Sequence, residues 1–101
     1  MDERRMKIIE EKEQLINQLS EIRAELLSAT IDYKKVQNGL WLNTDFAEAI
    51  GRSRPTVDEK KAYISEHSLT HKLVKEELYN KVQYLLLKIE LCDDKLRCCD
   101  E

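Results

Sequence analysis

Apolar residues recur at alternating steps of three and four along the first third of the chain. The series starts at Ile8, is interrupted by one lysine, and becomes a regular heptad pattern that continues to Val36. Such a pattern keeps one narrow apolar stripe of a helix facing a partner helix. Gly39 follows, and glycine adopts the left-handed conformation that ends many helices at low steric cost. The pattern predicts a helix over residues 3–38.

A second heptad series runs from Val74 to Cys99 and belongs to a second long helix. The start of this helix is marked by Thr56 and Glu59, which have the spacing of a capping box. The only proline of the chain directly precedes this pair and disfavours helix in the residue before it. No further break is evident, and the sequence predicts one helix over residues 57–98.

Residues 39–56 connect the two helices and contain a short helix of their own. Asn43 or Thr44 is expected to cap a helix over residues 45–50, and Gly51 is expected to end it. The apolar residues here are expected to form a small knob that closes the hairpin, with the members Leu40, Trp41, Leu42, Phe46 and Ile50. Two interpretations stay open. The knob is a structural cap, or Trp41 is exposed and anchors a binding partner.

The fold class predicted is all-α: an antiparallel two-helix coiled-coil hairpin that forms a single domain over residues 1–101. In this arrangement Ile22 is expected opposite Leu73, and Ile8 opposite Leu86 and Leu87. The last residues of the chain then overhang the N-terminus. One seam between two helices buries too little apolar surface to offset the conformational entropy lost on folding. The hairpin is therefore expected to assemble into a helical-bundle oligomer.

The surface for this self-association is indicated by apolar residues outside the heptad series. Leu86, Leu87 and Leu91 lie in a segment that is apolar around the whole helix. Ile9 and Ile16 form a sparser second line on the first helix. A helix that is apolar on more than one face needs more than one neighbour. A homodimer is the commonest solution, and a different partner along the same face is the alternative.

Histidine and cysteine offer two candidate metal sites, and neither has a convincing spacing. His67 and His71 share a helical face, but the glutamate of the zinc-protease motif is not in its place. They are interpreted as polar residues at the edge of the apolar stripe, with metal binding as the alternative. Cys92, Cys98 and Cys99 lack the paired spacing of structural zinc sites. Packing is the first interpretation for these thiols, and an intermolecular disulfide is the second.

Composition, charge and the absence of known motifs argue against several classes of function. The net charge of −3 argues against a general nucleic-acid-binding protein. No apolar run is long enough to span a membrane, and the charged N-terminus does not resemble a secretory signal, so a cytoplasmic location is expected. Neither a glycine-rich phosphate loop nor a catalytic triad pattern is found. The sequence predicts a protein that is not an enzyme and binds no cofactor.

The connection carries a resemblance to known proteins. The segment LNTDFAEAIGRSRPTVDEKKAYI, Leu42 to Ile64, resembles the centre of small helical proteins from phages and prophages of Gram-positive bacteria. In that family two charged helices flank a similar LNTD, GxSRPT and Glu-Lys run. The resemblance implies a small phage interaction protein, and it supplies no catalytic residues.

These observations favour a protein-binding function, as a phage accessory or inhibitor protein that engages a host or phage protein. The expected partner-binding residues are Trp41, Phe46, Arg52 and Arg54 at the tip of the hairpin. The first alternative is a nucleic-acid accessory factor in phage replication or recombination, in which the two arginines contact phosphate. The second alternative is a purely structural oligomerisation module.

Overall fold

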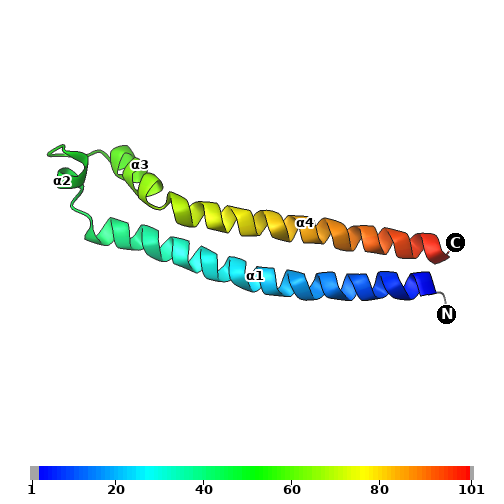
Figure 1. Cartoon of the computed structure of the whole chain (residues 1–101). Helices are drawn as coiled ribbons and strands as arrows, with labels where there is room; N and C mark the ends of the chain where they lie inside the picture. Colours follow the sequence, from blue (N-terminus) through cyan, green and yellow to red (C-terminus); the bar gives the residue numbers. More distant parts are fainter. Residues whose placement is uncertain (1–2, 101) are drawn as a thin grey trace. The chain divides into compact units, whose positions relative to one another are not determined.

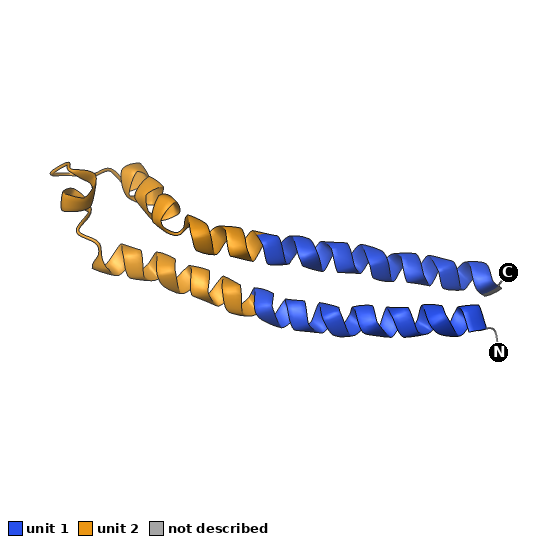
Figure 2. Cartoon of the chain, in the orientation of Figure 1, with its two compact units in different colours: residues 1–26, 77–101 blue, residues 27–76 orange. Residues whose placement is uncertain are grey.

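The computed structural model describes residues 3–100, and within that range it contains helices and no strands. The prediction of an all-α hairpin is confirmed, because two long helices pack against each other and a short helix lies between them in the chain (Figure 1). The helices are α1 (Glu3–Asn43), α2 (Phe46–Ile50), α3 (Val57–His67) and α4 (Leu69–Asp100). The chain divides into two compact units, residues 1–26 with 77–101 and residues 27–76 (Figure 2).

The first unit pairs the N-terminal half of α1 with most of α4. Its core consists of one row of residues from each helix, Ile8, Leu15 and Leu19 on α1 and Val82, Leu85 and Cys92 on α4. All of them belong to the two heptad series of the sequence. Further members of both series border the core and are partly buried, namely Ile22, Leu26, Ile89, Leu96 and Cys99. The heptad pattern therefore identified the faces that the two helices turn toward each other.

The pairing of residues across this unit differs from the prediction. Lys12 of α1 forms an ion pair and hydrogen bond with Asp93 of α4. Ile22 lines a surface depression together with Lys81 and Leu85, farther along α4 than the predicted Leu73. α1 extends past its predicted end, so the midpoint of the connection between the two long helices lies nearer the C-terminus than predicted. The α4 residues that face α1 therefore also lie nearer the C-terminus than predicted. The last turns of α4 consequently pack on α1, and the predicted C-terminal overhang is wrong.

The second unit contains the end of α1, all of α2 and α3, and the first turns of α4. Its buried residues are Phe46 on α2, Ile64 on α3, and Ser68 between α3 and α4. The ammonium group of Lys75 on α4 lies 5.5 Å from the centre of the Tyr33 ring on α1. Apolar and cation–π contacts thus hold these segments together within the unit.

Two predicted helix boundaries are wrong. Gly39 lies inside α1, which continues to Asn43, so this glycine does not end the helix. The chain is also broken where one long helix was predicted, because Ser68 separates α3 from α4. The Ser68 hydroxyl donates to the Ile64 carbonyl at 2.6 Å, and its amide donates to the same oxygen at 2.9 Å. A serine hydroxyl that bonds to the backbone in this way competes with the regular hydrogen bonding of a helix. The spacing of apolar residues gives no indication of such a break.

Within residues 3–100, every helix is too short or too polar to cross a membrane.

Candidate protein-binding site

Four ring-bearing side chains form a continuous series of contacts in the second unit. The Trp41 and Phe46 ring centres are 5.6 Å apart, with the planes tilted at 58°. Phe46 and Tyr63 are 5.9 Å apart and nearly perpendicular, at 85°. Tyr63 and His67 stack at 3.9 Å, with an angle of 21° between their planes. We call Trp41, Phe46, Tyr63 and His67 the aromatic ladder. Its separations and tilted or stacked geometries are those in which rings attract one another.

The ladder joins three helices that are separate in sequence. Trp41 comes from the last turn of α1, Phe46 begins α2, and Tyr63 and His67 lie one turn apart on α3. The His67 Nδ1 atom is 2.9 Å from the Tyr63 carbonyl oxygen, which fixes the imidazole against its neighbour. Lys60 adds an ammonium group 5.6 Å from the centre of the Phe46 ring. These contacts hold the end of α1 beside α2 and α3.

The local sequence explains why the chain turns sharply enough to bring these rings together. The Asp45 carboxylate accepts a hydrogen bond from the Glu48 amide at 3.2 Å, so Asp45 caps α2 and the predicted caps Asn43 and Thr44 do not. Gly51 ends α2 with φ of 79°, which confirms the prediction for this residue. Most residues with a Cβ atom avoid that conformation. The short helix is therefore bounded on both sides by residues suited to a stop and a restart.

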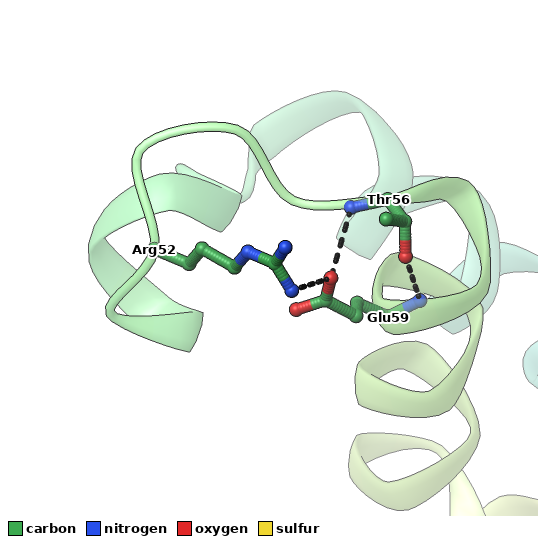
Figure 3. Close-up of polar contacts among 3 residues, drawn as sticks. All are labelled: Arg52, Thr56 and Glu59. Atoms are coloured by element: carbon green, nitrogen blue, oxygen red, sulfur yellow. Dashed lines mark hydrogen bonds and ion pairs between the residues drawn. The ribbon is translucent and has the colours of Figure 1, made fainter.

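Figure 3 shows the polar contacts that follow the turn, where Arg52, Thr56 and Glu59 meet. The Thr56 hydroxyl accepts from the Glu59 amide at 3.1 Å, and the Glu59 carboxylate accepts from the Thr56 amide at 3.3 Å. The predicted capping box is thus confirmed. The same carboxylate oxygen also accepts from the Arg52 guanidinium at 2.7 Å. Arg52 therefore supports the start of α3 as well as lying at the surface.

The predicted partner-binding residues differ greatly in how much surface they offer. Phe46 is buried, with 9% of its surface exposed, and serves mainly as the centre of the ladder. Trp41 retains 41% exposure although one side packs on Phe46. Arg54 is exposed, and the Arg52 side chain is 62% exposed although it pairs with Glu59. A partner would therefore meet Trp41 and the arginines before it meets Phe46.

The predicted position of Leu42 is wrong. We expected it inside the apolar knob, yet it is 83% exposed at the end of α1. The reason is the extension of α1 past Gly39, because consecutive helical residues point about 100° apart. Trp41 can therefore face Phe46 while its neighbour Leu42 faces away. We call Trp41 and Leu42 the tip pair.

The residues predicted for self-association differ in how exposed they are. Leu87 and Leu91 are 60% and 57% exposed on α4, and Ile16 is 46% exposed on α1. Ile9 is half-buried. Leu86 is partly buried against the core of the first unit, which corrects its assignment to a surface away from the seam.

The residues around the histidine pair and around the cysteines do not support either candidate metal site. His67 and His71 are both exposed, and His67 is used in the ladder. Among residues 3–100, no three His, Cys, Asp or Glu side chains gather closely enough to hold a metal ion. Cys92 is buried in the core and Cys99 borders it, as expected for packing, whereas Cys98 is exposed.

In comparisons with known proteins, no family model, no curated protein and no solved structure matches the chain. The candidate site is therefore defined by its geometry. The tip pair places a fixed aromatic ring and an exposed aliphatic side chain at consecutive positions. Arg52 and Arg54 lie in the turn that follows α2, and both are exposed.

Proposed function

We propose that the protein is a non-catalytic protein-binding protein that engages its partner through the tip pair. The observation that supports this most directly is the exposure of Trp41 and Leu42, at 41% and 83%, next to a packed aromatic ladder. Large apolar side chains at this exposure are desolvated when a partner covers them, and tryptophan is the residue type most enriched among binding hot spots.

The ladder makes Trp41 a better anchor than a free surface tryptophan. Its ring is already in contact with Phe46, which in turn contacts Tyr63. Less side-chain conformational entropy remains to be lost on binding, so more of the contact energy contributes to affinity. Phe46 thus acts as a positioning residue for Trp41.

Arg52 and Arg54, in the turn that follows α2, suit the edge of an interface. Arginine is enriched at protein interfaces, and the rim of a typical interface is polar and solvent-accessible. The pairing of Arg52 with Glu59 leaves that guanidinium largely exposed, and Arg54 is exposed in the same turn. Arg52 can contact a partner while it keeps its pairing with Glu59, which lowers the cost of placing its charge at an interface.

The biological role we propose is that of a phage accessory or inhibitor protein acting on a host or phage protein in the bacterial cytoplasm. Its support is the resemblance of residues 42–64 to the central segment of small phage and prophage proteins. That segment includes Leu42, Arg52 and Arg54. The resemblance and the proposed surface therefore concern the same part of the chain.

The test is affinity capture from infected and uninfected host lysates with matched variants of the full chain. Leu42→Glu removes the exposed side chain without disturbing the ladder, and Leu87→Glu is the control in the other unit. We expect partner proteins to be captured by the wild type and by Leu87→Glu, and to be lost with Leu42→Glu. Capture that survives Leu42→Glu and fails with Leu87→Glu would contradict the proposal.

The same experiment distinguishes a nucleic-acid accessory role. In that case nucleic acid would be retained, its binding would fall steeply between low and physiological salt, and Arg52→Glu with Arg54→Glu would abolish it. Protein binding through an apolar anchor depends far less on salt, because its main contribution is not electrostatic.

A further inference from the structure

One side of α1 in the second unit carries two pairs of exposed apolar residues. The first pair is Leu27 and Ile31, which are 63% and 44% exposed, and the second is the tip pair. At about 100° per residue, Trp41 lies about 40° around the helix from Leu27. Leu42 lies about 20° from Ile31 by the same measure. The two pairs therefore share one side of α1, with their centres about 19 Å apart along the axis. We call Leu27 and Ile31 the middle pair.

This side of α1 is not the side that contacts α4 within the unit. That contact is made by Tyr33, which is half-buried and lies against the ammonium group of Lys75. Tyr33 follows Ile31 by two positions, which places it about 160° away around the helix. The middle pair therefore remains exposed while α1 and α4 are in contact, as the tip pair does.

Between the two apolar pairs the same side of α1 is basic. Lys34 and Lys35 are both exposed, and they lie about 20° and 80° around the helix from Leu27. The one carboxylate between residues 27 and 43 is that of Asp32, about 180° around the helix from Trp41. Among residues 3–100, neither lysine forms an ion pair with a carboxylate of the chain. A partner on this side would thus meet an apolar contact, then positive charge, then a second apolar contact.

We propose that the partner docks an acidic amphipathic helix along this side of α1. Its apolar residues cover the middle pair and the tip pair, and its carboxylates lie beside Lys34 and Lys35. The inference rests on the proposed function and names the chemistry of the partner. A helix of about 14 residues, about 21 Å long, reaches from Leu27 to Trp41. Carboxylates in the partner pair the two lysines when the interface excludes water, whereas lysines in the partner would meet like charge.

A helix suits this surface better than an extended segment does. Extended segments bind by adding a strand to the edge of a sheet, and residues 3–100 contain no strand. The backbone groups inside α1 are already paired within the helix, so recognition has to come from side chains. An amphipathic helix presents apolar side chains at steps of three and four residues, which include the spacing of the middle pair.

The experiment that tests this chemistry uses the full chain and two synthetic peptides of about 18 residues, or about 27 Å of helix. Both are held helical by a side-chain staple and carry leucine along one face. One has glutamate beside the leucines, and the other has lysine at the same positions. Neither contains tryptophan, so the emission of Trp41, the only tryptophan of the chain, reports binding.

We expect the glutamate peptide to bind about tenfold more tightly than the lysine peptide, because only the first pairs Lys34 and Lys35. It should also shift the Trp41 emission to shorter wavelength, since the ring loses contact with water. Equal affinities, tighter binding of the lysine peptide, or no binding of the glutamate peptide would overturn the proposal.

Variants of the chain locate the bound peptide. Lys34→Glu with Lys35→Glu should weaken the glutamate peptide about tenfold and favour the lysine peptide instead. Leu27→Glu should weaken both peptides, because it places a charge on the apolar contact. Leu73→Glu is the matched control, since Leu73 is 54% exposed on α4 in the same unit. Circular dichroism of each variant checks that the helices are unchanged. A preference that survives the double reversal, or equal losses in Leu27→Glu and Leu73→Glu, would place the peptide elsewhere and overturn the proposal.

The same variants separate this inference from the proposed function when they are used in affinity capture from lysates. A partner lost with Leu42→Glu, Leu27→Glu and the double lysine reversal, and kept by Leu73→Glu, agrees with both proposals. A partner lost with Leu42→Glu but kept by Leu27→Glu and the double reversal leaves the proposed function standing and overturns the acidic helix along α1. A partner kept by Leu42→Glu contradicts the proposed function itself.

Discussion

The two glycines of the chain should respond in opposite directions to the same substitution. Gly39 lies inside α1, whereas Gly51 ends α2 with φ of 79°. A Cβ atom built at either position meets no other atom within 4 Å. Packing therefore contributes nothing to the difference between the two substitutions, and only the backbone conformation decides the sign.

The expected magnitudes follow from that conformation. Gly39→Ala should stabilise the fold by about 0.5–1 kcal/mol, since alanine is that much more favourable than glycine inside a helix. Gly51→Ala should destabilise it by about 1–2 kcal/mol, the cost of holding a residue with a Cβ atom in the left-handed region. Gly51→Asn should cost less than Gly51→Ala, because asparagine tolerates this region better.

Urea unfolding followed by far-ultraviolet circular dichroism measures these free energies. The protein concentration must be the same for every variant, because self-association would shift the apparent stability. If Gly39→Ala destabilises the protein as Gly51→Ala does, α1 ends near residue 38 as the sequence pattern predicted. That result would refute the continuous helix.

Three further substitutions test other parts of the fold by the same unfolding measurement. Thr56→Ala should cost about 1 kcal/mol because it removes the cap of α3, whereas Thr56→Ser, which keeps the hydroxyl, should be nearly neutral; equal losses would contradict a role for the hydroxyl. Leu85→Ala should cost about 2–5 kcal/mol by leaving a cavity in the core of the first unit, and a loss below about 1 kcal/mol would place Leu85 outside it. Ser68→Ala should cost about 1 kcal/mol through the lost hydrogen bond to Ile64, and unchanged stability would show that this bond is not needed.

The features that the sequence predicted correctly depend on short-range or periodic signals. The heptad series found the core residues of the first unit because helical periodicity and burial on one face share the same spacing. The capping box at Thr56 and Glu59 was found because its side-chain and backbone contacts lie within one helical turn. Gly51 was found because it closes an apolar segment of helical spacing.

The features that the sequence missed depend on competition between local signals or on contacts between distant residues. Asn38 and Gly39 read as a helix end, yet contacts of Trp41 with Phe46 are made when α1 continues past them. Glycine inside a helix costs at most about 1 kcal/mol, which tertiary packing can exceed. The aromatic ladder joins residues on three helices, and heptad spacing carries no information about which of them meet.

The tip pair lies in the second unit, whereas Leu85 and Leu87 lie in the first, so the effects of substitutions in the two units can be told apart. A substitution in the core of the first unit, such as Leu85→Ala, disturbs the packing of α4 on α1 in that unit. We expect the contact of Trp41 with Phe46 to remain, because both residues belong to the second unit. Such a variant should therefore keep its partner binding as long as it folds, and loss of binding in a folded first-unit variant would contradict binding through the tip pair. Leu42→Glu and Leu87→Glu differ in unit but make the same chemical change at highly exposed leucines, so any difference between them reports location and not chemistry.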